Sequence, residues 1–477
     1  MTPQAETLPR LSYSTLASVS SPPVVLPGYV RPARPPGVVH LGLGAFHRAH
    51  QAMVFDALLT RGDPRWGVLG VAMRSTQVAD TLNAQDGFYS VQVSSAGGIK
   101  WQVVGAIWQT CVAAREPDRV CQAMAAPSTR WLTLTVTEKG YTAELAALIV
   151  RGLAARFSAG LAGLTLASCD NLSGNGDLLR ALCLEAAGDT GLREWLGKKC
   201  AFPNSMVDRI VPAATPQCLD EAAAALQLHD ECALATESFW AWVMEDNFAD
   251  ASDADALRSV GVTVVPAVRP FEEAKLRMLN GSHTAMACMG AVLGLPNVSD
   301  CIVQKDILAY VYGLMTHEVM PNLHRPDLET YRDDLLARFA NPALRHSVHQ
   351  IAKDCSQKIP QRWPPSIKAQ LSKARGVEHL AFAAAAWMRY CRGADEQGVA
   401  YALSDQLAAE LQAAALRHQG HAADTVKALL AIPSIWGETL PKDPHWAGRV
   451  SFWLADIDAQ GLLLALQKLN QQTRVVT

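Results

Sequence analysis

Residues 38–47 read Val-Val-His-Leu-Gly-Leu-Gly-Ala-Phe-His, and this stretch decides the fold. Its first residues form an apolar run typical of a buried strand, and the residues that follow have helical spacing. Between the two, Gly42 permits a tight turn and Gly44 lets the backbone approach a pyrophosphate. Ala45 and Phe46 then begin a helix, whose N-terminus supplies N–H groups and a partial positive charge. The stretch therefore predicts a cofactor site for a dinucleotide, made by Gly42, Gly44, Ala45 and Phe46.

The motif departs from the usual dinucleotide fingerprint in two places. His47 stands where a third glycine would allow the helix to pack closely on the strand. The acidic residue expected on the ribose about 20 residues later is also missing, because residues 71–76 read Val-Ala-Met-Arg-Ser-Thr. Arg74 is a candidate for stacking on adenine or for binding a 2′-phosphate, and its alternative is a solvated surface position. The choice between NAD and NADP stays open at this point.

Strand-like and helical stretches alternate through the first half of the chain. After the first strand, apolar or β-branched runs occur at 66–73, 131–137 and 164–171. Such alternation indicates βαβ units and a parallel sheet. From about Lys275 onward the sequence is rich in Ala and Leu, and strand-like runs nearly vanish. We expect an α/β domain with a parallel-sheet core, followed by a mostly α-helical domain.

The length of the chain also favours two domains. Its 477 residues exceed the roughly 250–300 that one hydrophobic core usually serves. Residues 1–36 are rich in Pro and Ser and predict an irregular entry segment. We place the dinucleotide-binding domain at 37–270 and the helical domain at 271–477.

The composition excludes several classes of protein. Hydrophobic residues make up 49% and charged residues 18%, which is globular rather than disordered. The 42 basic and 45 acidic residues give a net charge of −3, so neither nucleic acid nor an anionic membrane is an expected partner. The 11 cysteines include no C-x-x-C pair, which favours reduced thiols over disulfides or structural zinc. With no signal peptide and no apolar run of 18 residues, we expect a cytoplasmic protein.

The segment at 271–283 carries the candidate catalytic groups. On an α-helix, Lys275, Asn280 and His283 would stand at about 0°, 140° and 80°, and so share one broad face. Such a trio is more often a solvated face than an active site. Two other solutions for alcohol oxidation are nevertheless missing, since the chain has no Tyr-x-x-x-Lys and no Cys/His set with zinc-site spacing. A lysine base without a metal would be a third solution.

Seven stretches together resemble one known family, the long-chain mannitol dehydrogenases that act on polyols. They begin at residue 40 and continue to about residue 364, with looser likeness beyond. The stretches are HLGLGAFHRAHQA, LTVTEKGY, SCDN, FPNSMVDRIVPAATP, EDNF, KLRMLNGSH and SQKIPQRW. The resemblance implies a Rossmann-type N-terminal domain, a helical C-terminal domain, a nicotinamide cofactor (NAD, with NADP not excluded) and no metal.

The resemblance also implies roles for individual residues. Lys275 matches the catalytic lysine, which is the base in alcohol oxidation and the acid in ketone reduction. Asn171 and Asn280 match two asparagines that hold the reacting oxygen. His283 matches a histidine that contacts substrate, and Glu272 matches a carboxylate linked to proton movement.

Three further residues are weaker candidates. Asp208, in MVDRI, matches an aspartate of the family's site and is assigned to substrate binding. Glu138 and Lys139 follow a strand, so they either approach the nicotinamide or simply end the strand. We count both as cofactor-binding candidates.

The proposed chemistry asks for an unusual lysine. An ordinary lysine has a pKa of about 10.4 and is a poor base at neutral pH. Burial beside the cationic nicotinamide would lower that pKa, as general-base catalysis requires. Two fixed amide donors would stabilise the negative charge that develops on the substrate oxygen.

The substrate is the least determined part of the expectation. Lys358 and Arg362 are candidate ligands for a carboxylate, and arginine can bind one in bidentate fashion. They are otherwise plain surface charges. Mannitol-active members of the family carry an arginine eight residues before this lysine, where Gln350 stands here. We therefore favour the branch that interconverts D-fructuronate and D-mannonate.

Two alternatives stay open. One is a mannitol 2-dehydrogenase that interconverts D-mannitol and D-fructose. The other is a nicotinamide-binding sensor without turnover, although such a protein would not need Lys275, Asn171, Asn280 and His283. The resemblance implies a monomer with a small-molecule substrate, and a weak homo-oligomer is left open.

Overall fold

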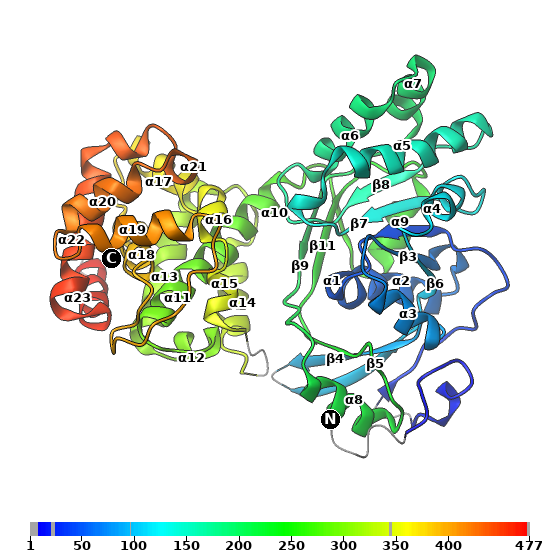
Figure 1. The fold of residues 1–477 in the computed structure, drawn as a ribbon, viewed down its shortest axis with the longest axis horizontal. Coiled ribbons are helices and arrows are strands. Elements are labelled where there is room, and N and C mark those ends of the chain that lie inside the picture. The colour runs from blue at the N-terminus through cyan, green and yellow to red at the C-terminus, as the bar shows by residue number, and fades with distance from the viewer. Residues whose placement is uncertain (1–7, 21–23, 96, 343–345, 475–477) are drawn as a thin grey trace. The chain divides into compact units, whose positions relative to one another are not determined.

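The structure is a computed structural model that describes residues 8–20, 24–95, 97–342 and 346–474. It separates into two compact units, Met1–Arg269 and Pro270–Thr477 (Figure 1). Part of the expected entry segment, residues 1–7 and 21–23, lies outside the described residues.

The core of the first unit is a five-stranded sheet in which all neighbouring strands are parallel. In spatial order the strands are β6 (Ile107–Val112), β3 (Val68–Ala72), β2 (Val38–Leu41), β7 (Trp131–Leu134) and β8 (Thr165–Ser168). The chain fills one side of β2 first and the other side afterwards. The strand order therefore reverses between β2 and β7, the place where open α/β sheets bind ligands at their carboxyl ends.

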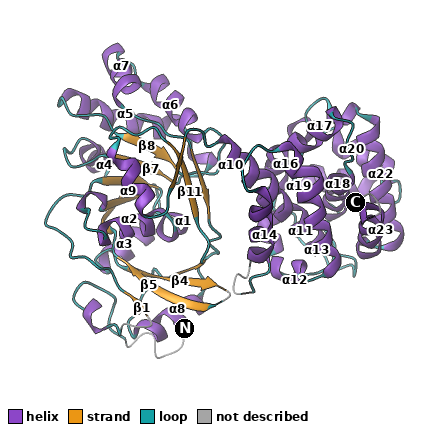
Figure 2. Ribbon diagram, turned by 180° about the vertical axis from the view of Figure 1, so that it is seen from behind, coloured by secondary structure: helices purple, strands orange, loops and turns teal. Residues whose placement is uncertain are grey.

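Helices cover both faces of this sheet (Figure 2). They are α1 (Ala45–Ala49), α2 (Gln51–Thr60), α3 (Gln77–Ala84), α4 (Pro117–Met124), α5 (Ala143–Ser158), α6 (Asn175–Ala186) and α7 (Thr190–Lys199). Val38 packs in one cluster with side chains of α2, whereas Val39 and Leu41 pack in another with side chains of α4 and α5. Because alternate residues of β2 face opposite helical layers, its residues on both faces are mostly apolar, which explains the apolar residues Val38, Val39 and Leu41.

The predicted fold class is confirmed. β2, β3, β7 and β8 lie within the four strand-like stretches, although β7 ends at Leu134, earlier than the pattern indicates. The expected helix after β2 is divided into α1 and α2, because His50 leaves helical geometry at φ −131° and ψ −89°.

Two smaller sheets complete the first unit, and the sequence analysis does not predict them. One has the order β1 (Val24–Val25), β5 (Gly98–Val104), β4 (Tyr89–Ser95) and β10 (Leu234–Glu237). The other has the order β12 (Thr263–Val265), β11 (Ala241–Glu245) and β9 (Ser205–Asp208). The remaining elements are η2 (Leu16–Ser18), η3 (Pro64–Trp66), η4 (Glu138–Gly140), α8 (Pro216–Leu226) and α9 (Ser252–Ser259).

The second unit is built from helices, and its described residues contain no β-strand. Its α-helices are α10 (Arg269–Ala274), α11 (Gly281–Val292), α12 (Val298–Ile302), α13 (Lys305–Gly313), α14 (Leu328–Phe339), α15 (Val348–Ala352), α16 (Cys355–Arg362), α17 (Pro364–Ser372), α18 (Glu378–Tyr390), α19 (Ala408–Arg417), α20 (Ala422–Leu430), α21 (Pro433–Trp436), α22 (Pro444–Gln460) and α23 (Leu462–Arg474). Its other turns are the π-helices η5 (Lys275–Asn280) and η6 (Leu314–Val319) and the 3-10 turns η7 (Met320–Asn322) and η8 (Leu440–Lys442).

Helix α11 is the centre of this unit. Every residue of α11 is buried, and α11 packs against the almost wholly buried α18. A helix that is apolar all round belongs in a core, so the other helices wrap these two. Among the described residues, no helix combines the length and hydropathy needed to cross a membrane.

Candidate active site

The turn after β2 has the geometry of a phosphate-binding loop. Gly42 has φ +101°, and a Cβ there would lie 2.1 Å from the carbonyl oxygen of Thr135. Only glycine fits that position without strain or clash. A Cβ on Gly44 would meet nothing closer than the Gly42 oxygen at 3.8 Å. The turn is closed on the strand side and open on the other, which leaves room for a ligand.

The first residues of α1 face the same open side. Gly44 is exposed and is the N-cap residue, while Ala45 and Phe46 are half-buried. No side chain caps the helix, and the first N–H groups of any helix lack partners within it. These groups and Gly44 fit the pyrophosphate of a dinucleotide.

Two buried histidines support the turn from behind. The rings of His40 and His47 stack with centroids 3.4 Å apart. The Gly42 carbonyl accepts a hydrogen bond from Thr135 Oγ1 at 2.7 Å and lies 3.0 Å from His40 Nε2. Burial lowers the pKa of His40 to about 3, and burial followed by repulsion from His40 lowers that of His47. Both rings are therefore neutral at physiological pH.

A cavity of about 560 Å³ lies at the carboxyl ends of β3, β6 and β7. Arg74 and Lys139 line it, together with Glu144. It lies at the same edge of the parallel sheet as the glycine turn, and this place and its size suit the adenosine half of a dinucleotide. Arg74 is exposed, and Glu138 is exposed without lining the cavity.

The loop after β7 is held by hydrogen bonds to one aspartate, Asp170. Thr137 has φ +65°, a strained value for a β-branched residue. Asp170 accepts the N–H groups of Thr137 at 2.7 Å and Val136 at 3.2 Å, and the Tyr141 hydroxyl at 3.0 Å. Burial raises the pKa of Asp170, and these hydrogen bonds oppose that effect. Asp170 thus holds the loop that carries Glu138 and Lys139.

Two further candidates lie in this unit. Asn171 directly follows Asp170 beyond the carboxyl end of β8 and is exposed. Asp208 ends β9, where it pairs with Ala241 of β11, and its side chain is 3% exposed.

In the second unit, the candidate base lies in a π-helical turn. η5 runs from Lys275 to Asn280 between α10 and α11. A π-helix bonds residue i to residue i+5, so residues five apart are neighbours on one face, whereas an α-helix separates them by about 140°. The turn therefore brings Lys275 and Asn280 together more closely than α-helical geometry allows. Each is 9% exposed.

His283 lies three residues further on, on the same face at α-helical spacing. Its ring centroid is 4.5 Å from that of Phe339 and 5.4 Å from that of His346. Burial first, and then the charges of His346, Arg338 and Arg362, lower the pKa of His283 well below its usual value. Its Nε2 atom is buried without a hydrogen-bond partner among the described residues, so it suits an added polar ligand.

The two candidate carboxylate ligands lie on α16. Arg362 is buried, and its Nη1 donates to the Asn280 carbonyl at 3.1 Å and to the Thr284 hydroxyl. It is therefore not the plain surface charge of the alternative interpretation. Lys358 is half-buried, and its Nζ donates to the Ile351 carbonyl at 3.1 Å.

Glu272, the last of the candidates in this unit, lies on α10 and is 6% exposed. The second unit thus carries the candidate base Lys275, the amide of Asn280, the imidazole of His283 and Arg362 on η5, the start of α11 and the end of α16. Sequence reasoning missed Thr284 and His346, which bind or face these groups. Thr284 directly follows the segment at 271–283, so its place in the sequence could have suggested it.

Known proteins resemble the chain over nearly its whole length. The family model described as Mannitol dehydrogenase Rossmann domain matches residues 36–254, and the one described as Mannitol dehydrogenase C-terminal domain matches 267–457. D-mannonate oxidoreductase of Escherichia coli K12 is 37% identical, over 91% of this chain and 95% of that protein. Mannitol 2-dehydrogenase of Phaeosphaeria nodorum is 34% identical, over 92% of this chain and 82% of that protein.

A solved structure agrees with these matches. The ternary complex of Pseudomonas fluorescens mannitol 2-dehydrogenase with NAD and D-mannitol is similar at a TM-score of 0.86 and 29% identity, covering 97% of this chain and 99% of that one. The resemblance noted in the sequence is confirmed: the chain is an oxidoreductase of the mannitol dehydrogenase family.

Proposed function

We propose that the protein is an NAD-dependent secondary-alcohol dehydrogenase that interconverts D-fructuronate and D-mannonate without a metal. The observation that carries this proposal is the π-helical turn that begins at Lys275 and ends at Asn280, two residues that are both buried. A pure cofactor-binding protein has no use for that arrangement.

Lys275 exchanges the proton with the substrate oxygen. Burial disfavours the charged ammonium, so a buried amine gives up its proton more readily than one in water. The nicotinamide ring, when bound, takes up or delivers the hydride. Glu272, buried one helical turn before Lys275, passes the proton onward.

The asparagines stabilise the oxygen as its charge develops. Asn171 and Asn280 each donate an amide N–H to it, and one such fixed donor can be worth about 2.7–4 kcal/mol in the transition state. The Arg362 hydrogen bond to the Asn280 carbonyl keeps that residue in place. His283 contacts a substrate hydroxyl through the Nε2 atom that has no other partner.

Charge supports a uronate as substrate. Lys358 and Arg362 lie on the same helix, one turn apart, and Asp208 of the first unit is assigned to substrate hydroxyls. Two cations suit a carboxylate, which D-fructuronate and D-mannonate carry and which mannitol lacks. Gln350 stands in place of the arginine of mannitol-active relatives.

A second candidate is mannitol 2-dehydrogenase activity. It is favoured by the similarity to the Pseudomonas fluorescens enzyme, whose structure holds NAD and D-mannitol. The same structure supports NAD as the cofactor, bound by Gly42, Gly44, Ala45 and Phe46.

The test is oxidation of NADH or NADPH, followed by absorbance, with D-fructuronate, D-fructose and related keto-acids. We expect turnover with NADH and D-fructuronate at a kcat/KM well above that for D-fructose. Turnover with D-fructose alone would assign the polyol activity instead. Absence of turnover with every ketone would favour a sensor and reject both enzymes.

A further inference from the structure

A second cavity in the first unit lies at the amino edge of the parallel sheet. Its volume is about 670 Å³, within the range of small-molecule sites. Val39, Leu69 and Trp108 line it, and each is the second residue of its strand. The glycine turn follows the opposite end of β2, so this cavity is separate from the dinucleotide site.

The cavity is lined by cations and by no acid. Arg31, Arg34 and Arg119 contribute to it, and none of its lining residues is Asp or Glu. The chain as a whole carries a net charge of −3, so this balance is local. Glu116 pairs with Arg119 at 3.0 Å, but both side chains are 42% exposed, which makes the pair weak.

Two donors of the lining side chains lack acceptors. Arg31 donates from Nε to the Gly105 carbonyl at 3.0 Å and from Nη1 to the Asp86 carbonyl, and its guanidinium lies 3.8 Å from the Phe88 ring centroid. Its Nη2 is buried with no hydrogen-bond partner among the described residues. The Nε1 atom of Trp108 is likewise buried with no hydrogen-bond partner among the described residues. Buried donors of this kind call for an acceptor.

The remaining wall is flat and apolar. A Cβ on Gly67 would lie 2.4 Å from three atoms of the Trp108 ring, so the indole lies flat on the Gly67 backbone. Pro35 and Pro36, among other lining residues, add apolar surface. Aromatic rings favour stacked or edge contacts with such a wall.

We propose that this cavity binds a small aromatic anion, a single ring that carries a phosphate or a carboxylate. The arginines bind the anion, Arg31 Nη2 and Trp108 Nε1 donate hydrogen bonds to its oxygens, and the ring packs against Trp108. Binding here is independent of the dinucleotide at the other edge of the sheet.

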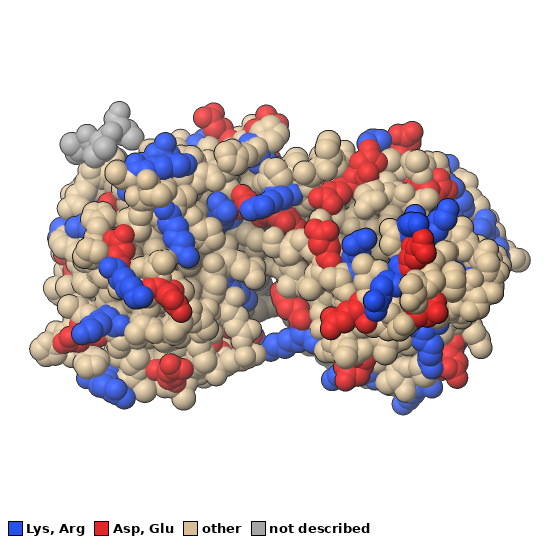
Figure 3. All heavy atoms as spheres, turned by 90° about the horizontal axis from the view of Figure 1, so that it is seen from above, with Lys and Arg blue, Asp and Glu red and all other residues tan. Residues whose placement is uncertain are grey.

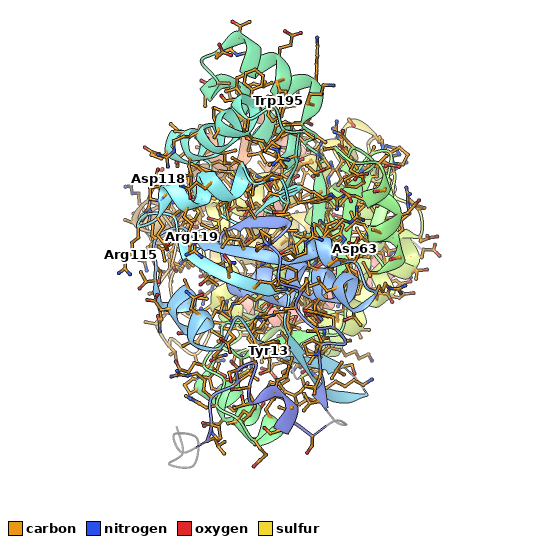
Figure 4. The ribbon with its side chains drawn as sticks, turned by 90° about the vertical axis from the view of Figure 1, so that its right-hand side faces the viewer. Tyr13, Asp63, Arg115, Asp118, Arg119 and Trp195 are labelled. Carbon is orange, nitrogen blue, oxygen red and sulfur yellow. The ribbon has the colours of Figure 1, made fainter. Side chains whose placement is uncertain are left out.

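The probe is 4-fluorophenyl phosphate, followed by ¹⁹F NMR titration of the full chain with and without excess NAD. We expect saturable binding that NAD does not displace. The double variant Arg34→Ala with Arg119→Gln removes two charge-assisted contacts and should weaken binding by about tenfold or more. Arg115→Ala removes an exposed arginine close by that does not line the cavity, and should leave binding unchanged (Figure 4).

Trp108→Leu tests the ring contact. It should weaken 4-fluorophenyl phosphate while leaving weak binding of inorganic phosphate, titrated by ³¹P NMR, unchanged. Displacement of the probe by NAD, equal affinity in the double variant, or no binding at millimolar concentration would each overturn the proposal. If Trp108→Leu fails to fold, the arginine variants decide the matter alone.

Discussion

Single residues decide whether the nucleotide turn can form. Gly42 combines a positive φ with a contact that leaves no space for a Cβ. Gly62 has a similar φ of +89°, but nothing lies within 4 Å of the place where its Cβ would stand. A substitution at Gly62 therefore tests backbone strain alone, whereas one at Gly42 tests strain together with the steric clash in the turn.

We predict that Gly42→Ala abolishes stabilisation by NAD. At a hundredfold excess over its dissociation constant, a ligand stabilises a fold by about 2.7 kcal/mol, which thermal unfolding detects. Gly62→Ala should lower the basal stability by a similar strain yet keep the NAD-induced shift. A full shift in Gly42→Ala would show that the cofactor binds elsewhere.

The buried His40 gives the stability a pH dependence whose sign is fixed. Its pKa is about 3 in the folded chain against 6.5 in an unfolded one. The unfolded state therefore binds more protons between these values, and stability is lost as pH falls below about 6.5, by up to about 1.4 kcal/mol per pH unit.

We predict that His40→Gln removes this slope. Denaturant unfolding should show a constant difference in the free energy of unfolding between parent and variant above about pH 7.5. Below about pH 6.5 this difference should change, because the parent loses stability faster as the pH falls. Parallel curves over the whole range would mean that burial does not lower the pKa of His40 in the folded chain.

The supports of the turn were invisible to sequence reasoning because they connect distant residues. His40 and Thr133 are 93 positions apart and meet only because β2 and β7 are paired. Gly42 and Lys275, by contrast, are marked by local patterns and by the family resemblance. Sequence thus identifies candidate reacting groups more readily than the residues that hold them.

At the scale of elements, the π-helical turn is the main departure from prediction. The helical wheel used for the sequence assumes 100° per residue and separates Lys275 from Asn280 by about 140°. Nothing in the residue types of this segment marks an i+5 register, so the closer neighbourhood could not be anticipated.

The hairpin of β4 and β5 was missed for a different reason. Ser90, Gln92 and Ser94 occupy buried positions on β4. Hydrogen bonds satisfy the polar groups of these buried residues: Ser90 donates to Asp230, and Gln92 donates to Glu221. Tyr89, Val91 and Val93 alternate with these polar residues, so the strand signal is present in the sequence and was overlooked.

Helix α16 contributes two cations, Arg362 and Lys358, that make different hydrogen bonds. We therefore expect substitutions at the two positions to change the free energy of unfolding by different amounts. Arg362→Gln removes charge-assisted hydrogen bonds to the start of α11 and should lower the free energy of unfolding by about 1.5–3 kcal/mol. Lys358→Met should cost less than about 1 kcal/mol, because it removes one bond of a half-buried side chain.

Both changes should raise KM for an anionic substrate by about tenfold, since each removes a charge-assisted contact. KM for D-fructose should hardly change. If Lys358→Met leaves KM for D-fructuronate unchanged, Lys358 does not bind its carboxylate.

At the scale of the whole molecule, the charges seen on the surface agree with the nearly balanced charge of the sequence. Basic and acidic side chains are interspersed on the face seen in Figure 3, without a field of one sign. The α/β unit ends at Arg269 and the helical unit begins at Pro270.

The central claim concerns one amine, and one variant tests it most directly. We measure kcat for ketone reduction and the dissociation constant of NADH in Lys275→Ala, with the exposed Lys353→Ala as control. The account predicts a fall in kcat of about 10²–10⁴-fold, typical for loss of a general acid–base, while NADH binding stays within about twofold. The Lys353→Ala variant should match the parent. A Lys275→Ala variant that turns over at the parent rate would contradict the mechanism.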